Sequence, residues 1–253
     1  SLAYKWWVNE NNEDYASFTF RKAEKFFDVI KYTGNGSSQT ISHNLSVAPA
    51  VIITKRTDDT SNWLVYHTSI STQNIYLNKT DAAAGTMGIT SVSDSSYAVN
   101  DSSELNENNG TYVAYLFAHN NSDGTFGPDG DQDIIKCGSY VGNGASSYTR
   151  EITLGFEPQW VLLKEASGSS DWWIQDNMRG DKLLQPNDSQ GDQTADFVEP
   201  TATGFKPGYP NQSNKTYIFM AVRRGQLALP TAGTEVFAID ASPNSSFPVY
   251  EAG

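Results

Sequence analysis

The sequence predicts an all-β protein built from two tandem β-sandwich modules related by internal duplication, and it leaves open the start of a third module. Three observations lead to this prediction. Several sequence blocks recur in the same order along the chain. Each block is typical of a short strand that ends in a polar turn. No long stretch shows the period of an amphipathic helix, so short strands separated by turns indicate sandwiches.

The repeats establish the duplication, because four matched blocks in one order are not expected by chance. The matched pairs are 32–36 (YTGNG) with 140–144 (YVGNG), 49–55 (PAVIITK) with 158–164 (PQWVLLK), 61–63 (SNW) with 170–172 (SDW), and 111–117 (TYVAYLF) with 216–222 (TYIFMAV). The sequence therefore predicts two copies of one module of roughly 100 residues, a common domain size.

Within each copy the blocks indicate particular strands. Residues 27–32 are rich in β-branched and aromatic side chains and end at a glycine-rich turn. The apolar runs 51–53 and 161–163 are typical of strands buried on both faces. The lysine after each run begins a hairpin, and the tryptophan at Trp63 or Trp172 begins its return strand. The segment 22–25 is too short to form a stable helix alone.

These patterns divide the chain into five parts. We expect an N-terminal segment that packs on a neighbour, two sandwich modules separated by an acidic, glycine-rich linker, and a final linker with the first strand of a further module. Their bounds are 1–25, 26–118, 119–133, 134–224 and 225–253. Within the first of them, Trp6 and Trp7 are expected to pack on another domain or subunit. The abrupt ends favour a piece of a longer protein.

Composition excludes several classes of partner. The 253 residues carry a net charge of −12, so nucleic acid and anionic membrane surfaces would repel the protein. No apolar run of about 18 residues exists, as membrane insertion by a helix would require. The single cysteine, Cys137, excludes an internal disulfide and is expected to be buried and inert inside a strand.

The repeated blocks resemble a module of virion proteins from marine bacteriophages, especially cyanophages. The resemblance rests on the Tyr-x-Gly-x-Gly turns, the Pro-led apolar strands ending in Lys, the Trp-containing strands and the closing aromatic strands quoted above, together with 129–138. Ser46 departs from the glycine usual in this family, whereas the second copy has Gly155. The resemblance covers about residues 26–240. It implies a structural virion protein, a tail fibre or appendage, that associates with other virion proteins as a homo-oligomer, a trimer by family analogy.

Four aromatic residues are candidates for stacking on the sugar rings of a host-surface glycan: Trp63, Tyr66, Trp172 and Trp173. The repeated position of Trp63 and Trp172 favours a place in the core for both. Because successive side chains of a strand point to opposite faces, Trp173 is expected to be the exposed one.

Four acidic residues of the linker are candidate ligands for Ca²⁺: Asp123, Asp129, Asp131 and Asp133. Calcium prefers hard oxygen ligands, and carboxylates alternating in a glycine-rich loop can converge on one ion. The spacing lacks the twelfth-position glutamate of an EF-hand. The alternative interpretation is a solvated acidic linker.

Catalysis has little support in the sequence. His43, His67 and His119 show no metal-binding spacing, and no Gly-x-Ser-x-Gly nucleophile motif is present. We therefore predict a non-enzymatic protein of the virion, involved in host-surface attachment, with no cofactor other than the candidate calcium. The alternatives are a carbohydrate-binding module of a secreted protein and a capsid decoration protein.

Overall fold

The computed structural model describes residues 15–145, 148–194 and 197–225. The prediction of an all-β fold is confirmed. Within these ranges the secondary structure consists of strands and one short 3₁₀ helix, η1 (Thr68–Ile70). The described residues include no helix that is long and apolar enough to cross a membrane. The strand expected after residue 225 and the pair Trp6–Trp7 lie outside the described residues.

The first module contains a five-stranded and a three-stranded antiparallel sheet. Strand order is β1-β8-β3-β4-β5 in the large sheet and β2-β7-β6 in the small one. The strands are β1 (Phe27–Thr33), β2 (Gln39–Ser42), β3 (Val51–Arg56), β4 (Trp63–His67), β5 (Ile75–Tyr76), β6 (Ile89–Val92), β7 (Ser96–Val99) and β8 (Thr111–Phe117).

The second module contains a six-stranded and a three-stranded antiparallel sheet. Strand order is β14-β13-β12-β11-β17-β9 in the large sheet and β10-β16-β15 in the small one. The strands are β9 (Ile135–Val141), β10 (Ile152–Thr153), β11 (Pro158–Glu165), β12 (Trp172–Asp176), β13 (Lys182–Leu184), β14 (Gln193–Thr194), β15 (Val198–Thr201), β16 (Gly204–Pro207) and β17 (Thr216–Arg223).

The two modules have the same topology. Replacing β1, β8, β3, β4 and β5 by β9, β17, β11, β12 and β13 converts the first large sheet into the second, which has β14 as an additional edge strand. Side-chain geometry repeats as well. Tyr32 pairs with Tyr112 and their rings stack at 5.0 Å and 12°, while Tyr140 pairs with Tyr217 and stacks at 5.1 Å and 17°.

The repeated Tyr-x-Gly-x-Gly turn has a steric cause in both modules. A Cβ atom at Gly34 would collide with the Glu107 carbonyl oxygen, and one at Gly142 would collide with that of Gln212. The later glycine of each turn has a positive φ, 69° at Gly36 and 68° at Gly144, which side chains other than glycine rarely adopt. Glycine is thus required twice in each turn.

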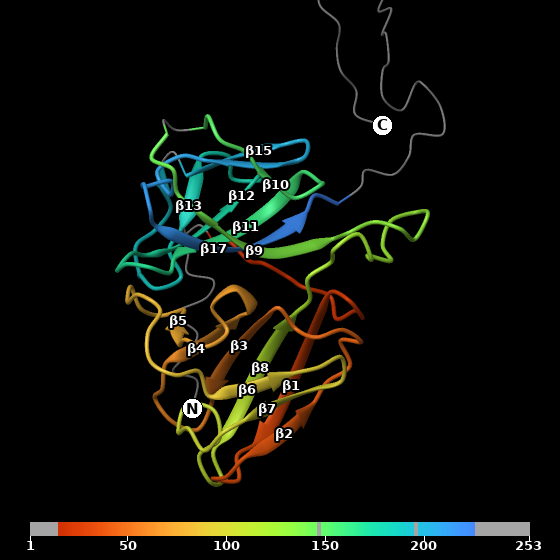
Figure 1. Ribbon diagram of the computed structural model, residues 1–253, viewed down its shortest axis with the longest axis vertical. Coiled ribbons are helices and arrows are strands. Elements are labelled where there is room, and N and C mark those ends of the chain that lie inside the picture. Colours follow the sequence, from red (N-terminus) through yellow and green to blue (C-terminus); the bar gives the residue numbers. More distant parts are fainter. Residues whose placement is uncertain (1–14, 146–147, 195–196, 226–253) are drawn as a thin grey trace, which may run out of the picture.

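The large sheets of the two modules lie toward each other, and the small sheets lie on the outside (Figure 1). Leu163 and Phe219 pack inside the second sandwich, whereas their strand neighbours Leu162 and Met220 belong to a core continuous with the first module. Strands β11 and β17 therefore bury both faces, as the apolar runs predict.

Backbone and side-chain hydrogen bonds connect the modules directly. The Trp172 indole Nε1 donates to the Tyr76 carbonyl over 2.8 Å, and the Lys164 ammonium donates to the Thr80 carbonyl over 3.2 Å. His67 Nε2 lies 3.1 Å from the Phe219 carbonyl. Because His67 Nδ1 accepts a hydrogen bond from the Ser69 amide, Nε2 carries the proton and is the donor.

The N-terminal segment packs at the junction of the modules. The Phe20 ring lies 5.4 Å from that of Phe117 in the first module and 5.7 Å from that of Trp160 in the second. The linker 119–133 also folds back on the protein: the buried Asn120 side chain donates to the Lys25 carbonyl and accepts from the Ile135 amide. These segments tie the modules together.

Candidate ligand-binding face of the first module

The face of the first large sheet that is turned away from its small sheet carries a row of side chains across four strands, beyond the part of this face that the second module covers. Lys31 lies opposite Val113, Val113 opposite Lys55, and Lys55 opposite Trp63. Residues opposite each other in neighbouring antiparallel strands project to the same side of the sheet. Val29 and Tyr115 form a neighbouring pair on this side. We call this surface the open face, defined by Val29, Lys31, Lys55, Trp63, Val113 and Tyr115.

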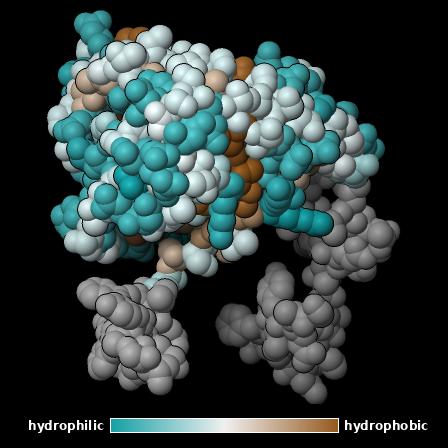
Figure 2. Space-filling model, turned by 90° about the horizontal axis from the view of Figure 1, so that it is seen from below, coloured by the Kyte–Doolittle hydropathy of each residue, from teal (hydrophilic) through white to brown (hydrophobic). Residues whose placement is uncertain are grey.

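An aromatic pair lies at the centre of the open face. The rings of Trp63 and Tyr115 are nearly parallel, with centroids 6.4 Å apart and an interplanar angle of 18°. Both side chains are half-buried, and Val29 beside them is 38% exposed. Figure 2 shows that the surface seen from the side of the first module is mainly hydrophilic, with a narrow hydrophobic strip. Flat aromatic surface beside hydrogen-bonding groups suits a sugar ring.

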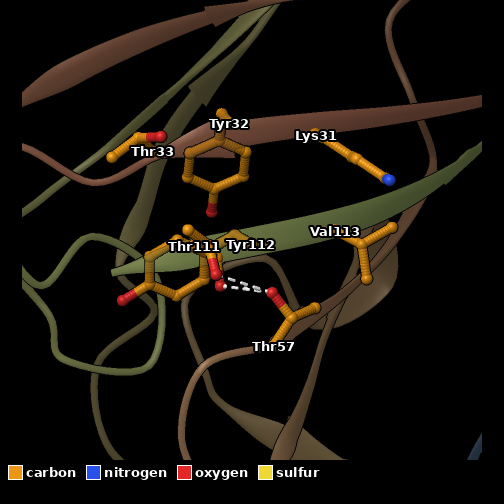
Figure 3. A pocket seen from close by; sticks show the side chains of 7 residues that line it. All are labelled: Lys31, Tyr32, Thr33, Thr57, Thr111, Tyr112 and Val113. Carbon is orange, nitrogen blue, oxygen red and sulfur yellow. Dashed lines mark hydrogen bonds between the residues drawn. The ribbon is translucent and has the colours of Figure 1, made fainter. Parts of the chain in front are cut away.

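A shallow hollow of about 420 Å³ adjoins the row at Lys31 and Val113 (Figure 3). The hydroxyls of Thr57 and Thr111 lie 2.7 Å apart and form a hydrogen-bonded pair on its wall. In Figure 3, Lys31 and Val113 lie on one side of this pair, and Tyr32 lies on the other. The hollow thus combines an ammonium donor, hydroxyls that both donate and accept, and apolar surface.

An ion pair holds the wall of the hollow in place. Arg56 contacts both carboxylate oxygens of Asp58, each over 3.1 Å, and Asp58 also accepts from the Thr111 amide over 3.0 Å. The hydrogen bond from Arg56 holds the pKa of Asp58 well below its usual value. Asp58 therefore stays ionised at neutral pH, and its contact orients Thr111.

The corresponding face of the second module is covered. The positions equivalent to the open face are Cys137, Ser139, Lys164, Trp172, Ile218 and Met220, and all except Ser139 are buried. The covering contacts are the intermodule hydrogen bonds of Lys164 and Trp172. Burial lowers the pKa of Lys164 to about 8, although its ammonium also donates to the carbonyls of Glu165 and Gly168. Duplication has thus produced one covered face and one open face.

The structure corrects the prediction that Trp173 is exposed. Trp173 is only 5% exposed, and its ring packs 4.4 Å from that of Phe197 inside the second sandwich. Trp172 is 2% exposed, so its expected place in the core is confirmed. Side chains alternate along the strand, so Trp172 and Trp173 do point to opposite faces of the sheet. Both are buried, because the small sheet covers one face and the first module covers the other.

Trp63 and Tyr66 differ in how much of each side chain is exposed. Trp63 was expected in the core, but it remains half-buried on the open face, since no second module covers this part of the sheet. Tyr66 is 6% exposed and points into the first sandwich. Of the four aromatic candidates, Trp63 is therefore the one with accessible ring surface.

The structure does not bring the acidic candidates together in a metal-binding cluster. Asp129 and Asp131 are exposed near the tip of a loop that is closed by pairing of Phe126 with Gln132. Asp133 accepts from the amides of Ser122 and Gly124 at the base of this loop. Asp123 accepts from the Asn121 amide, 2.7 Å away. In the described ranges no three His, Cys, Asp or Glu side chains are grouped to hold a metal.

Sequence reasoning missed most of the open face. Lys31, Lys55, Val113 and Tyr115 become neighbours only through strand register, which joins residues far apart in the chain. A comparison of the two copies carries a signal, since Val29 and Tyr115 align with Cys137 and Met220. Among the aromatic and lysine positions the difference is confined to Tyr115, because Lys55 and Trp63 align with identical residues and Ser139, which aligns with Lys31, is exposed.

Fold and surface together define an all-β protein of two fused sandwich modules with one accessible aromatic face. The chain belongs to the family described as Domain of unknown function (DUF7483), whose profile matches residues 21–224. The matched region contains both modules, so a single family domain includes the duplication. No curated protein and no solved structure matches the chain.

Proposed function

We propose that the protein is a non-enzymatic structural component of a bacteriophage virion, in a tail fibre or appendage, that attaches to host-surface glycan through the open face. The observation that carries this proposal is the contrast between two copies of one sheet face. The second copy is buried by intermodule contacts, whereas the first presents the parallel rings of Trp63 and Tyr115. The assignment to a virion rests on the sequence resemblance.

The chemistry of the open face favours a saccharide. Aromatic rings pack against the apolar CH surfaces of a pyranose, and the lysine and threonine groups next to them can bind its hydroxyls. A shallow hollow on a flat sheet suits an extended chain of sugar units better than a small enclosed ligand. The net charge of −12 disfavours nucleic acid as the partner.

A glycan array followed by tryptophan-fluorescence titration tests the attachment function. Trp63→Ala should weaken binding of the best glycan at least tenfold, about 1.4 kcal/mol, because it removes the stacking surface. Tyr209→Ala is the matched control, since Tyr209 is an aromatic residue 61% exposed in the second module. Equal affinity of Trp63→Ala and the unchanged protein would contradict the assignment of the open face.

The same open face also fits the alternative of a carbohydrate-binding module in a secreted protein. Antibody labelling of virus particles separates the two proposals, because labelled fibres or appendages support the first and unlabelled particles support the second. Labelling over the capsid shell would instead indicate a decoration protein.

The proposed oligomeric state is a homotrimer, by analogy with the fibre proteins that the sequence resembles. Analytical ultracentrifugation of the full chain should give the mass of three copies. A stable monomer at micromolar concentration would contradict the trimer without affecting the open face.

A further inference from the structure

Each large sheet ends in an edge strand at the equivalent position. Strand β1 lies at one end of the first large sheet and pairs with β8, and β9 lies at one end of the second and pairs with β17. The outer side of an edge strand presents backbone amides and carbonyls that can pair with a further strand. Both edges also carry an exposed apolar side chain, Val29 at 38% and Val141 at 53%. The two edges are therefore candidate surfaces for strand pairing between molecules.

Hydrogen bonds at both ends of β1 show which of its residues face outward. The Ala118 amide donates to the Phe26 carbonyl, and the Gly34 amide donates to the Gly110 carbonyl. Because hydrogen-bonded and non-hydrogen-bonded pairs alternate along an antiparallel ladder, the even-numbered residues of β1 bond to β8. The backbone groups of its odd-numbered residues therefore point away from the sheet.

Local contacts occupy the outer parts of the β1 edge and leave its middle free. The Val29 amide donates to Asp28 Oδ1, and the Thr33 carbonyl accepts from the Gln39 side chain. Four outward groups have no hydrogen-bond partner in the part of the chain that the structure describes. They are the Val29 carbonyl, the Lys31 amide and carbonyl, and the Thr33 amide.

Strand β9 repeats this arrangement. The backbone hydrogen bonds that flank its ladder with β17 also involve even-numbered positions on its side, so its odd-numbered residues face outward. The Cys137 amide donates to His119 Nδ1, and the Val141 carbonyl accepts from the Arg150 guanidinium. Among the described residues, four outward groups of β9 are again without a partner. They are the Cys137 carbonyl, the Ser139 amide and carbonyl, and the Val141 amide.

One antiparallel register matches the two sets of free groups. It places Lys31 of one copy opposite Ser139 of a second copy, so that each of these residues can donate to the other and accept from it. At the flanking positions each free amide meets a free carbonyl, and each occupied group meets another occupied group. The three pairs are Val29–Val141, Lys31–Ser139 and Thr33–Cys137.

Charge and apolar surface favour the pairing of unlike strands. Two β1 strands in the corresponding register would place Lys31 opposite its own copy, and like charges directly opposite destabilise a sheet. Two β9 strands would avoid this repulsion but would leave Val29 exposed. Pairing β1 with β9 places the neutral Ser139 opposite Lys31. It also places Val29 and Val141 on the same side of the joined sheet, where each covers the other.

We propose that the protein associates head to tail, with β1 of one copy pairing antiparallel with β9 of the next copy and Lys31 opposite Ser139. The inference rests on the proposed homo-oligomer and names the interface that forms it. A contact between two different surfaces closes into a ring or continues as a filament, and a ring of three copies is the proposed trimer. The added strand lies at the β1 edge, three strands away from Trp63, so it leaves the aromatic pair of the open face accessible.

Disulfide cross-linking tests the register of this pairing. Residues opposite each other in such a hydrogen-bonded pair have Cα atoms about 5.5 Å apart, a distance that suits a disulfide. A chain carrying both Val29→Cys and Val141→Cys should therefore form covalent multimers under mild oxidation, whereas each single variant should remain uncrosslinked. The matched control is a chain with Val29→Cys and Tyr209→Cys, since Tyr209 is 61% exposed and lies outside both edges. The native Cys137 is buried and does not compete.

A charge exchange tests the partner of Lys31. Ser139→Lys should weaken association about tenfold, measured by analytical ultracentrifugation, because it places two ammonium groups opposite each other. Adding Lys31→Glu to the same chain should restore association. Ser139→Thr, which keeps a neutral hydroxyl, should associate as the unchanged protein does.

The outcomes separate this interface from the proposed function. Cross-linking of a single cysteine variant with itself, or no rescue of Ser139→Lys by Lys31→Glu, would indicate pairing of identical strands and overturn the inference. A trimer mass that Ser139→Lys leaves unchanged would keep the proposed oligomer and overturn this interface. A stable monomer at micromolar concentration would overturn both, whereas attachment through the open face is decided separately by the glycan affinity of Trp63→Ala.

Discussion

Acidification should destabilise the protein through His67, which lies at the contact between the modules. His67 is 3% exposed, and burial lowers its pKa from 6.5 to about 4. The space beside it is about 10 Å³, at the lower limit for one water, so little room exists to hydrate an imidazolium. Protonation would also abolish the acceptor at Nδ1 for the Ser69 amide.

The sign and size of the stability change with pH follow from proton binding to His67. With its pKa lowered by folding, His67 takes up a proton more readily in the unfolded chain, so stability falls as pH decreases through 6.5 and toward 4. The expected loss between pH 7 and pH 5 is about 2 kcal/mol. It approaches about 3 kcal/mol below pH 4.

Urea denaturation followed by tryptophan fluorescence measures this loss at pH 7, 6 and 5. His67→Gln removes the titrating group and retains an amide donor toward the Phe219 carbonyl, so its stability should fall about 2 kcal/mol less than that of the unchanged protein. The other histidines contribute to both proteins and cancel in the difference. NMR titration of the unchanged protein provides an independent check. Equal pH dependence of the two proteins, or a His67 pKa near 6.5, would refute the reasoning.

Four further outcomes are expected. Lys164→Met should lower the free energy of unfolding, measured by urea denaturation, by about 2–3 kcal/mol, because it removes the ammonium that donates to the buried Glu165 carbonyl. Lys55→Met, at the partly exposed equivalent position, should lower it less. Gly142→Ala should cost more than about 2 kcal/mol through collision with Gln212, whereas Gly130→Ala, with a φ of 69° and open space around it, should cost about 1 kcal/mol. Cys137, whose thiol pKa is raised by burial, should react with a thiol reagent only after unfolding; rapid labelling of the native protein would contradict its burial. Asp133→Asn should lower the melting temperature and Asp131→Asn should not, because of these two residues Asp133 is the one that accepts from backbone amides. A large rise of the melting temperature in millimolar calcium would instead indicate that the acidic side chains converge on a metal ion.

Much of the fold could be predicted because the same strong local sequence signals occur in both modules. The hairpin that begins after Lys55 and returns at Trp63 is present in both copies, as strand pairing shows. The lysine recurs for a structural reason, since Lys55 donates to the Asp59 carbonyl and Lys164 to that of Gly168. A long side chain at the end of an apolar strand can satisfy the carbonyls of the turn that follows.

The candidate site was harder to predict because exposure depends on what covers each face. Alternation shows that Trp172 and Trp173 point in opposite directions, but it does not reveal that a small sheet lies on one side and another module on the other. Trp63 has the same local sequence signal as Trp172, yet it is only half-buried. The packing between modules decides this difference, and no local pattern records it.

The most direct test of attachment through the open face is an NMR footprint of the best-binding glycan on the full chain. Backbone and indole signals of Lys31, Val113, Tyr115 and Trp63 should shift together. Signals of Ile218 and Met220, at equivalent but covered positions, should remain unchanged at the same glycan concentration. A footprint that leaves the open face unchanged while the glycan binds elsewhere would contradict the proposed function.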